Sequence, residues 1–345
     1  MARNTLLIIG NGFDLQCGLQ SSYLDFFEWL RKNDDIANSN FWVIYLLNNL
    51  PNGQLWSDVE ESLREVLKDR YHDKSVIRNL QFHAGLDVSM RFGAHSTLEG
   101  KHKKIVEYIS DNLTVIKQTR MYWYLDQLRI FERIFSDYLK TEVSNNVYYQ
   151  SNGVKLMWML VNHGHENVYV ISFNYTNPFN QALLNINSIK SVINVHGTYQ
   201  DDNIIFGVDA TEKLVDDAYI FTKTHRKLLQ GGKNEALPRH VKKIKFYGHS
   251  LGNADYSYFQ SIFDHYNLYG DNLDLLNNRT GNKPVELLFY FAIFDKNREI
   301  EIRRDATENV YKLITTYSNS LDNEAHRKNL LHKLLLEGRI KIEFM

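Results

Sequence analysis

Polar side chains that could bind or attack a small molecule follow several apolar segments of the chain, at the points where those segments end. They are Asn11, Asp14, Asn174, His196, His249, Ser250 and Asp255. Ligands bind outside the carboxyl ends of the strands in an open parallel sheet, so these side chains are expected to share one rim. The pattern predicts a ligand site formed by several strand ends together.

Each of these residues also has a purely structural explanation when it is considered alone. Asn174 could cap the helix that follows it, and His196, which precedes a glycine, could be a turn residue. Ser250 could likewise belong to a turn, and Asp255 could be a solvated acid in the first turn of a helix. The prediction of a site therefore rests on their shared position at strand ends.

The N-terminal stretch Leu6–Ile9 and the turn Gly10–Gly12 are expected to organise the other elements around them. Four consecutive large aliphatic residues without alternation indicate a strand buried on both faces, as in a parallel sheet. The Gly-x-Gly turn lets a backbone approach a ligand closely, and a capped helix is expected to open near Ser22. Leu15 occupies the position of the third glycine of the dinucleotide-binding fingerprint, so an ordinary strand-to-helix turn explains the motif about equally well.

The remaining pattern predicts an α/β fold, a Rossmann-like open parallel sheet with a large helical insertion after the first strand. Helical spacing dominates residues 36–163, and this segment is predicted to be a helical insertion lobe. Residues 1–35 and 164–345 are predicted to form the nucleotide-binding domain. Its further strands are expected at 168–173, 192–195, 204–207, 245–247 and 285–292, with helices at 253–266 and 298–336 and an edge strand at 339–344.

Composition excludes several classes of protein. The chain of 345 residues has a formal net charge of −1 and no basic cluster, so nucleic acid is not an expected partner. Cys17 is the only cysteine, which excludes an intrachain disulfide and agrees with a reducing cytoplasm. No secretory signal and no apolar run long enough for a membrane span are recognised, and a cytoplasmic location is expected.

Five motifs together resemble the AbiH-like family of bacteriophage abortive-infection proteins. They are GNGFDL-x3-L-x2-SY-x-DF from Gly10, FNYTN from Phe173, VHGT from Val195, IFG from Ile205 and GHSL-x3-D-x2-YF from Gly248. In the helical middle only Trp56-Ser57-Asp58-Val59-Glu60 matches. The resemblance implies a role in phage defence. It leaves open whether a phage-encoded trigger is a partner and whether the protein forms a homo-oligomer.

The same motifs are more loosely similar to the sirtuin-like fold, in which they surround NAD. This resemblance implies that Asn174 positions a water and the ribose hydroxyls, and that His196 is the general base. It implies that Asn11 and Gly12 cradle the pyrophosphate through their N–H groups, while Asp14 stabilises the sugar cation or binds a hydroxyl. The residues implied to bind the nucleotide are Gly10, Asn11, Gly12, Phe13, Tyr175, Gly248, His249, Ser250 and Asp255. The motif differs from the sirtuin pattern at Thr176, where an aspartate is usual.

A single cysteine cannot form the four-cysteine zinc site of deacetylating sirtuins, so the resemblance favours an NAD hydrolase without a metal.

A second hypothesis is a serine hydrolase. Gly248–Gly252 has the G-x-S-x-G spacing of a nucleophile elbow, and Asp295 with His326 or His332 would complete a triad in the usual chain order. A third hypothesis is a scaffold that senses a nucleotide or a phage component without catalysis.

Overall fold

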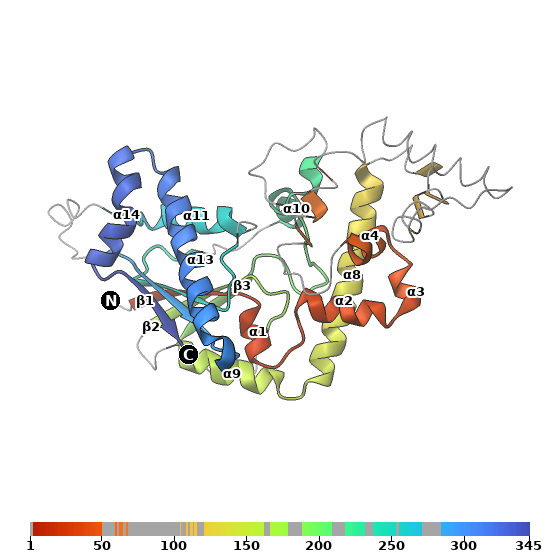
Figure 1. Ribbon diagram of the computed structural model, residues 1–345, viewed down its shortest axis with the longest axis horizontal. Helices are drawn as coiled ribbons and strands as arrows, with labels where there is room; N and C mark the ends of the chain where they lie inside the picture. The colour runs from red at the N-terminus through yellow and green to blue at the C-terminus, as the bar shows by residue number, and fades with distance from the viewer. Residues whose placement is uncertain are drawn as a thin grey trace. The chain divides into compact units, whose positions relative to one another are not determined.

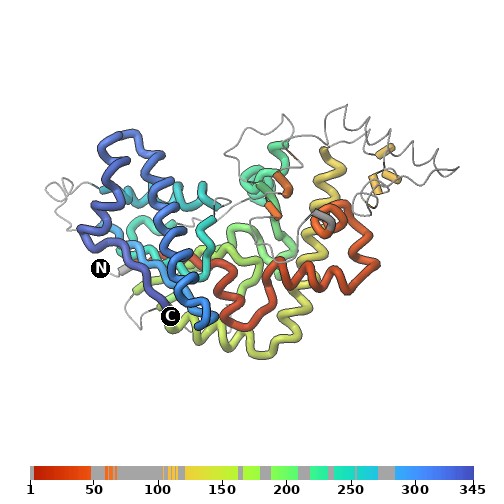
Figure 2. Tube along the Cα trace, viewed as in Figure 1, coloured from red at the N-terminus to blue at the C-terminus, as the bar shows by residue number. Residues whose placement is uncertain are grey.

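The computed structural model consists of two compact units, which are described separately. Unit 1 contains Met1–Leu19, Glu142–Gln200 and Lys233–Met345, and unit 2 contains Gln20–Thr141 and Asp201–Gly232. The structure describes residues 3–49, 59, 60, 62–64, 67, 104, 108, 109, 111, 112, 114, 115, 121–161, 166–178, 188–208, 218–231, 237–252, 255–270 and 284–345. The path of the chain can be followed in Figure 1 and Figure 2.

Unit 1 is built on a six-stranded sheet in which all neighbouring strands run parallel. Its strands are β1 (Arg3–Ile9), β2 (Glu166–Ser172), β3 (Ile189–Asn194), β4 (Lys243–Tyr247), β5 (Glu286–Phe291) and β6 (Ile340–Phe344). The spatial order β3-β2-β1-β4-β5-β6 is that of the Rossmann fold. The predicted α/β class, the interior position of the first strand and the C-terminal edge strand are confirmed.

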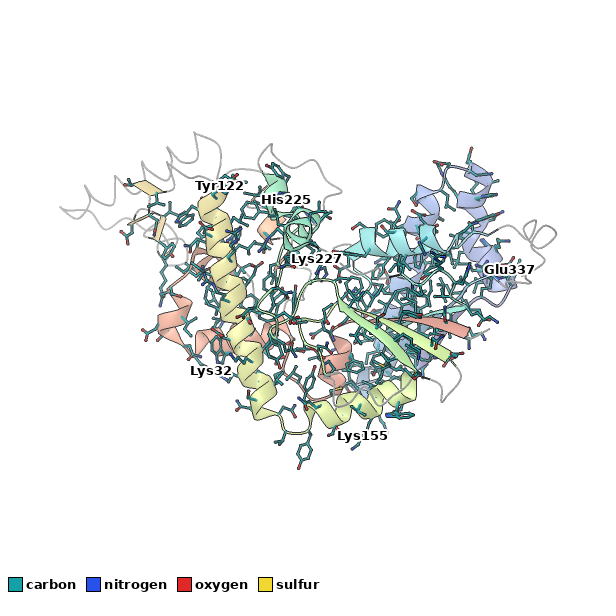
Figure 3. The ribbon with its side chains drawn as sticks, turned by 180° about the vertical axis from the view of Figure 1, so that it is seen from behind. Lys32, Tyr122, Lys155, His225, Lys227 and Glu337 are labelled. Carbon is teal, nitrogen blue, oxygen red and sulfur yellow. The ribbon has the colours of Figure 1, made fainter. Side chains whose placement is uncertain are left out.

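Helices cover both faces of this sheet. They are α1 (Gly12–Gln16), α9 (Tyr149–Leu160), α11 (Tyr256–His265), α13 (Glu299–Ser320) and α14 (Glu324–Leu336), with the short η3 (Lys296–Arg298) before α13. Leu6 and Ile8 of β1 pack in the core with α11, α13 and α14, whereas Leu7 and Ile9 pack on the opposite face with α1 and α9. Successive side chains of a strand alternate between faces, so this double covering buries all four residues. Figure 3 shows Lys155 on the side of α9 that faces away from the sheet.

Unit 2 is helical in its described part and has a core rich in aromatic side chains. Its elements are α2 (Tyr23–Arg31), α3 (Asp34–Ala37), α4 (Phe41–Asn49), most of α8 (Met121–Asn145), η1 (Ala218–Phe221) and α10 (Lys223–Gln230). The predicted helix start at Ser22 is confirmed, because Ser22 and Asp25 form a reciprocal capping box at the start of α2. Edge-on packing of Phe26 against Phe135, with ring centroids 5.0 Å apart, joins α2 to α8.

Two predicted elements differ from the structure. The segment 204–207 is not a strand, because its backbone binds side chains: the Phe206 N–H donates to Glu132 and its carbonyl accepts from Arg226, both at 2.7 Å. The long helical stretch predicted over 298–336 is helical but is divided into two helices, and the Asn323 side chain caps the second one. Within the predicted helical segment 36–163, most of residues 50–120 lie outside the described residues.

The boundaries of the two units differ from those of the predicted domains. The predicted boundary at residue 163 would assign α9 to the insertion lobe, but α9 belongs to unit 1 and packs on its sheet. Residues 201–232 conversely belong to unit 2. None of the described helices combines the length and the apolar character that crossing a membrane requires.

Candidate functional site

The loops after β1 and β4 pack directly against each other through glycines. A Cβ atom on Gly10 would lie 2.7 Å from the Cα of His249, and a Cβ on Gly12 would lie 2.7 Å from the Cα of Gly248. Gly248 has a φ of 66°, a conformation that favours glycine. Contact between neighbouring loops therefore explains these glycines, and it occurs where the strand order reverses, which is the usual place of ligand binding in such sheets.

Backbone N–H groups of the Gly10–Gly12 turn already donate hydrogen bonds to other parts of the chain. The Gly12 N–H, which was predicted to hold a pyrophosphate, donates to the Gly248 carbonyl at 2.8 Å. Gly12 is also the first residue of α1, a short helix that the sequence analysis did not predict. A phosphate-binding role for Asn11 stays a prediction.

Asp14 lies in α1, and its two carboxylate oxygens form a closed hydrogen-bonded group with two hydroxyl side chains. Its carboxylate accepts hydrogen bonds from Tyr149 at 2.8 Å and from Thr176 at 2.6 Å. Burial raises the pKa of Asp14 from 3.8 to about 6, and the hydrogen bonds from Thr176 and Tyr149 oppose this rise. Asp14 is therefore a solvent-shielded carboxyl group whose charge changes close to neutral pH.

Asn174 follows β2 and carries a buried amide. The side chain is 2% exposed, and neither its Nδ2 nor its Oδ1 makes a hydrogen bond to another described residue. The amide is near enough to Asp14 to lower the pKa of that carboxyl, although it lies outside hydrogen-bonding geometry. A buried amide without partners costs free energy, and a ligand that supplied those partners would remove the cost.

Asn194, the last residue of β3, holds the loop that carries Asn174. Its side-chain N–H groups donate to the carbonyl of Asn174 at 2.8 Å and to the carbonyl of Thr176 at 2.9 Å. One side chain thus fixes the backbone on which two site residues lie. Asn194 is a positioning residue that the sequence analysis missed.

Two histidines and one aspartate form a second buried group. The Nε2 of His196 lies 2.8 Å from Asp255 Oδ1, and the Nε2 of His249 lies 3.3 Å from Asp255 Oδ2. The Nδ1 of His249 accepts from the Leu251 N–H at 2.9 Å, so the proton of neutral His249 is on Nε2. Because ionised Asp255 only accepts, we assign the Nε2 proton to His196 as well, which leaves its Nδ1 as the basic nitrogen.

The loop that carries Asn174 also contacts this second group. The rings of Phe173 and Tyr175 lie 5.5 Å and 6.2 Å from the ring of His196. Tyr258 of α11 lies edge-on to the same imidazole, with centroids 5.6 Å apart. His196 therefore lies among aromatic rings, which shield it and Asp255 from water.

Some predicted ligand-binding residues have other surroundings. Phe13 is fully buried in the apolar core and packs edge-on against Tyr247, with ring centroids 6.1 Å apart. Ser250 is exposed and makes no hydrogen bond to another described residue. Asp255 is 6% exposed and binds both histidines, so it is not a solvated acid. Tyr175 is buried beside His196.

Among the described residues, Ser250 makes no hydrogen bond to Asp295, His326 or His332, the residues of the hypothetical serine-hydrolase triad. Asp295 caps η3 by accepting from the Asn297 N–H at 2.9 Å, and His326 stacks on Tyr269 with ring centroids 3.6 Å apart. The backbone of Ser250 also lacks a positive φ; in this segment Gly248 and Leu251 have it. The strained serine of a nucleophile elbow is therefore not seen among the described residues.

Three residues of the site were not predicted. Thr176 lies within the FNYTN motif that follows β2, and Asn194 is the last residue of β3, so both lie at strand ends as the predicted residues do. Tyr149 carries no comparable signal, because it comes from α9 and lies 135 positions after Asp14 in the sequence.

Comparison with known proteins gives one match. The family model described as "Bacteriophage abortive infection AbiH" matches residues 6–270, which include most of β1, all of β2 to β4 and both polar groups described above. No curated protein and no solved structure matches the chain. The matched segment covers well over half of the chain, and the protein therefore belongs to the AbiH family of bacteriophage abortive infection proteins.

Proposed function

We propose that unit 1 hydrolyses the N-glycosidic bond of NAD or a related nucleotide, and that this reaction is the step by which the protein acts against phage. The observation that carries the proposal is the buried His196–Asp255 pair beside the loop of Asn174, whose amide has no partner among the described residues. A base and an unpaired amide at the carboxyl rim of a Rossmann-type sheet are suited to activating water against a bound nucleotide. A phage-encoded trigger would start this reaction.

Each residue has a defined part in the proposed reaction. Asn174 binds the attacking water and the ribose hydroxyls through its amide atoms. His196 removes a proton from that water through Nδ1, and Asp255 stabilises the imidazolium that results. Asp14, when ionised, places a negative charge near the sugar as its cationic character develops.

The bonds and charges of the reaction balance without a further reagent. The oxygen of water forms a bond to the anomeric carbon, and the bond from that carbon to the nicotinamide nitrogen breaks. Its electron pair leaves with nicotinamide and neutralises the pyridinium charge. The proton taken by His196 is released to solvent, so the products are ADP-ribose, nicotinamide and one proton.

A non-catalytic nucleotide sensor remains the second candidate, because the Asn174 amide, which has no hydrogen-bond partner among the described residues, would serve binding as well as catalysis. The two functions differ in a direct assay. Purified protein is incubated with NAD, and nicotinamide is measured by chromatography, with and without a lysate of phage-infected cells as a source of the trigger.

Variants separate the two candidates. We expect His196→Ala and Asn174→Ala to lower nicotinamide release by about 10²-fold or more, whereas His265→Ala, an exposed histidine of α11, leaves it unchanged. Undiminished release by both site variants, or no release by the parent protein under either condition, would reject the hydrolase. NAD binding by the inactive parent would then support the sensor.

A further inference from the structure

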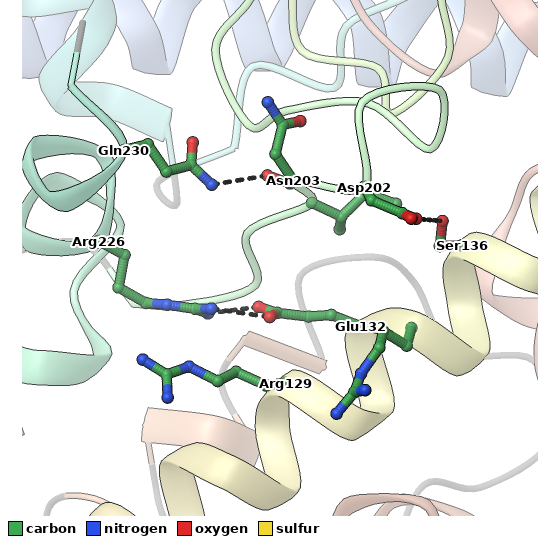
Figure 4. Close-up of a pocket in the computed structure, with 9 residues that line it drawn as sticks. Arg129, Glu132, Ser136, Asp202, Asn203, Arg226 and Gln230 are labelled. Carbon is green, nitrogen blue, oxygen red and sulfur yellow. Dashed lines mark hydrogen bonds and ion pairs between the residues drawn. The ribbon is translucent and has the colours of Figure 1, made fainter.

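A polar cavity in unit 2 lies outside the proposed nucleotide site. It has a volume of about 280 Å³ and lies between α8, α10 and the segment 202–204. Its walls include the arginines Arg129, Arg133 and Arg226 and the carboxylates Glu132 and Asp202. Figure 4 shows these residues, with the guanidinium groups of Arg129 and Arg226 on the same side of the cavity.

One wall of the cavity is rigid and electrically neutral. The guanidinium of Arg226 binds both carboxylate oxygens of Glu132, with its Nη2 2.7 Å from Oε2. Both side chains are largely buried, and each also bonds the backbone of Phe206. Arg226 is therefore engaged in holding the wall, and its charge is cancelled by Glu132.

Once Arg226 and Glu132 are paired, the lining of the cavity retains two arginines and one carboxylate. Arg129 and Arg133 lie one turn apart on the same face of α8, an arrangement of like charges that disfavours the helix. Arg129 pairs with Asp126 at 3.0 Å in an exposed ion pair, and its charge also opposes the rise that burial causes in the pKa of Glu132. Arg133 makes no ion pair or hydrogen bond to another described residue. Asp202 is the only opposing carboxylate of the lining, once Glu132 is paired.

Asp202 itself is unusual in two respects. Its φ is 50°, which is uncommon for a residue other than glycine. Its carboxylate has Ser136 as a hydroxyl neighbour at 3.5 Å, the outer limit of a hydrogen bond. The Asp202 carboxylate can therefore accept a hydrogen bond from a hydroxyl of a ligand. Arg129 and Arg133 can bind the anionic end of the same ligand.

We propose that this cavity binds a small phosphorylated sugar, with its phosphate at Arg129 and Arg133 and a hydroxyl at Asp202. Guanidinium groups match the oxygens of a phosphate in forked geometry. The volume of the cavity suits a small phosphorylated sugar and is too small to hold a folded segment of a protein or nucleic acid. The site gives unit 2 a ligand of its own, independent of the reaction proposed for unit 1.

Ribose 5-phosphate is a suitable probe, with ribose and orthophosphate for comparison, and binding to the full chain is measured by calorimetry. We expect ribose 5-phosphate to bind more tightly than orthophosphate, and ribose alone not to bind. Arg129→Ala with Arg133→Ala should weaken binding by at least about tenfold. Arg31→Ala, which removes an exposed arginine from α2 in the same unit, is the matched control and should leave affinity unchanged.

Three results would reject the proposed sugar-phosphate site. The proposal is wrong if the parent protein does not bind ribose 5-phosphate at millimolar concentrations, or if the double variant binds it as well as the parent does. An equal loss with Arg31→Ala would indicate general charge attraction and would also reject the site. Both arginines are exposed, so their removal leaves the core intact, and circular dichroism verifies the fold.

Discussion

The Nε2 atom of His196 lies 2.8 Å from the carboxylate of Asp255, and both side chains are buried. The two residues are separated by 59 positions, and the contact joins the loop after β3 to the start of α11. A buried carboxylate at this distance fixes both the orientation of the imidazole and the nitrogen that carries its proton. The basic nitrogen of His196 is therefore Nδ1.

Asp255→Asn tests this assignment. Asparagine has the same shape but can present an N–H to His196, which moves the imidazole proton and removes the negative charge that stabilises imidazolium. We expect the rate of nicotinamide release to fall by about 10²-fold or more with little change in KM. Asp322→Asn, in the exposed loop between α13 and α14, is the control and should retain the parent rate. Full activity of Asp255→Asn would exclude the proposed positioning role.

Asn174→Ala separates a functional residue from a structural one. Since the Asn174 amide has no hydrogen-bond partner among the described residues, its removal takes away a desolvated polar group and no bond. We expect the free energy of unfolding to stay within about 1 kcal/mol of the parent value or to rise, while nicotinamide release falls. Urea unfolding measures the first quantity. A large loss of stability would show that Asn174 mainly supports the fold.

Asp14→Asn should change how stability depends on pH. Burial raises the pKa of Asp14 in the folded protein from 3.8 to about 6, so between these values the folded chain binds more protons than the unfolded chain. The unfolding free energy of the parent therefore falls as pH rises through this window, and the variant lacks this loss.

The expected size of this effect follows from the shift. Relative to the parent, Asp14→Asn should gain about 2 kcal/mol between pH 4 and pH 7. Urea unfolding at both pH values measures the gain. A stability difference that stays constant over this range would contradict a raised pKa at Asp14.

Gly12→Ala and Gly252→Ala form a matched pair. A Cβ on Gly12 would meet the backbone of Gly248 at 2.7 Å, whereas a Cβ on Gly252 would meet only the Ser250 hydroxyl at 3.6 Å. We expect the first substitution to destabilise the protein by roughly 1–3 kcal/mol, because the two loops must separate. The second should be nearly neutral by thermal unfolding. Equal melting temperatures for the two variants would contradict the close packing of the loops.

The sequence predicted the parts of this protein that depend on local pattern. The unbroken aliphatic run Leu6–Ile9 identified an interior parallel strand, and the Ser22–Asp25 spacing identified the start of α2. The contact between Asp14 and Tyr149 was not predictable, because it depends on how α9 packs on the sheet. The absence of a strand at 204–207 could not be foreseen either, since Glu132 and Arg226 from distant helices satisfy its backbone.

The contacts among Asp14, Tyr149 and Thr176 outnumber the hydrogen atoms that are available to form them. Three oxygen-to-oxygen contacts of 2.8, 2.6 and 2.9 Å link the three residues in a triangle, to which Asp14 contributes both carboxylate oxygens, but the two hydroxyls supply only two hydrogens. A third proton, on Asp14, would give every edge of the triangle its own hydrogen and leave the group uncharged. The triangle is therefore a place where one proton can be stored close to the rim of the sheet. Below about pH 6 the rim gains this proton and loses one negative charge.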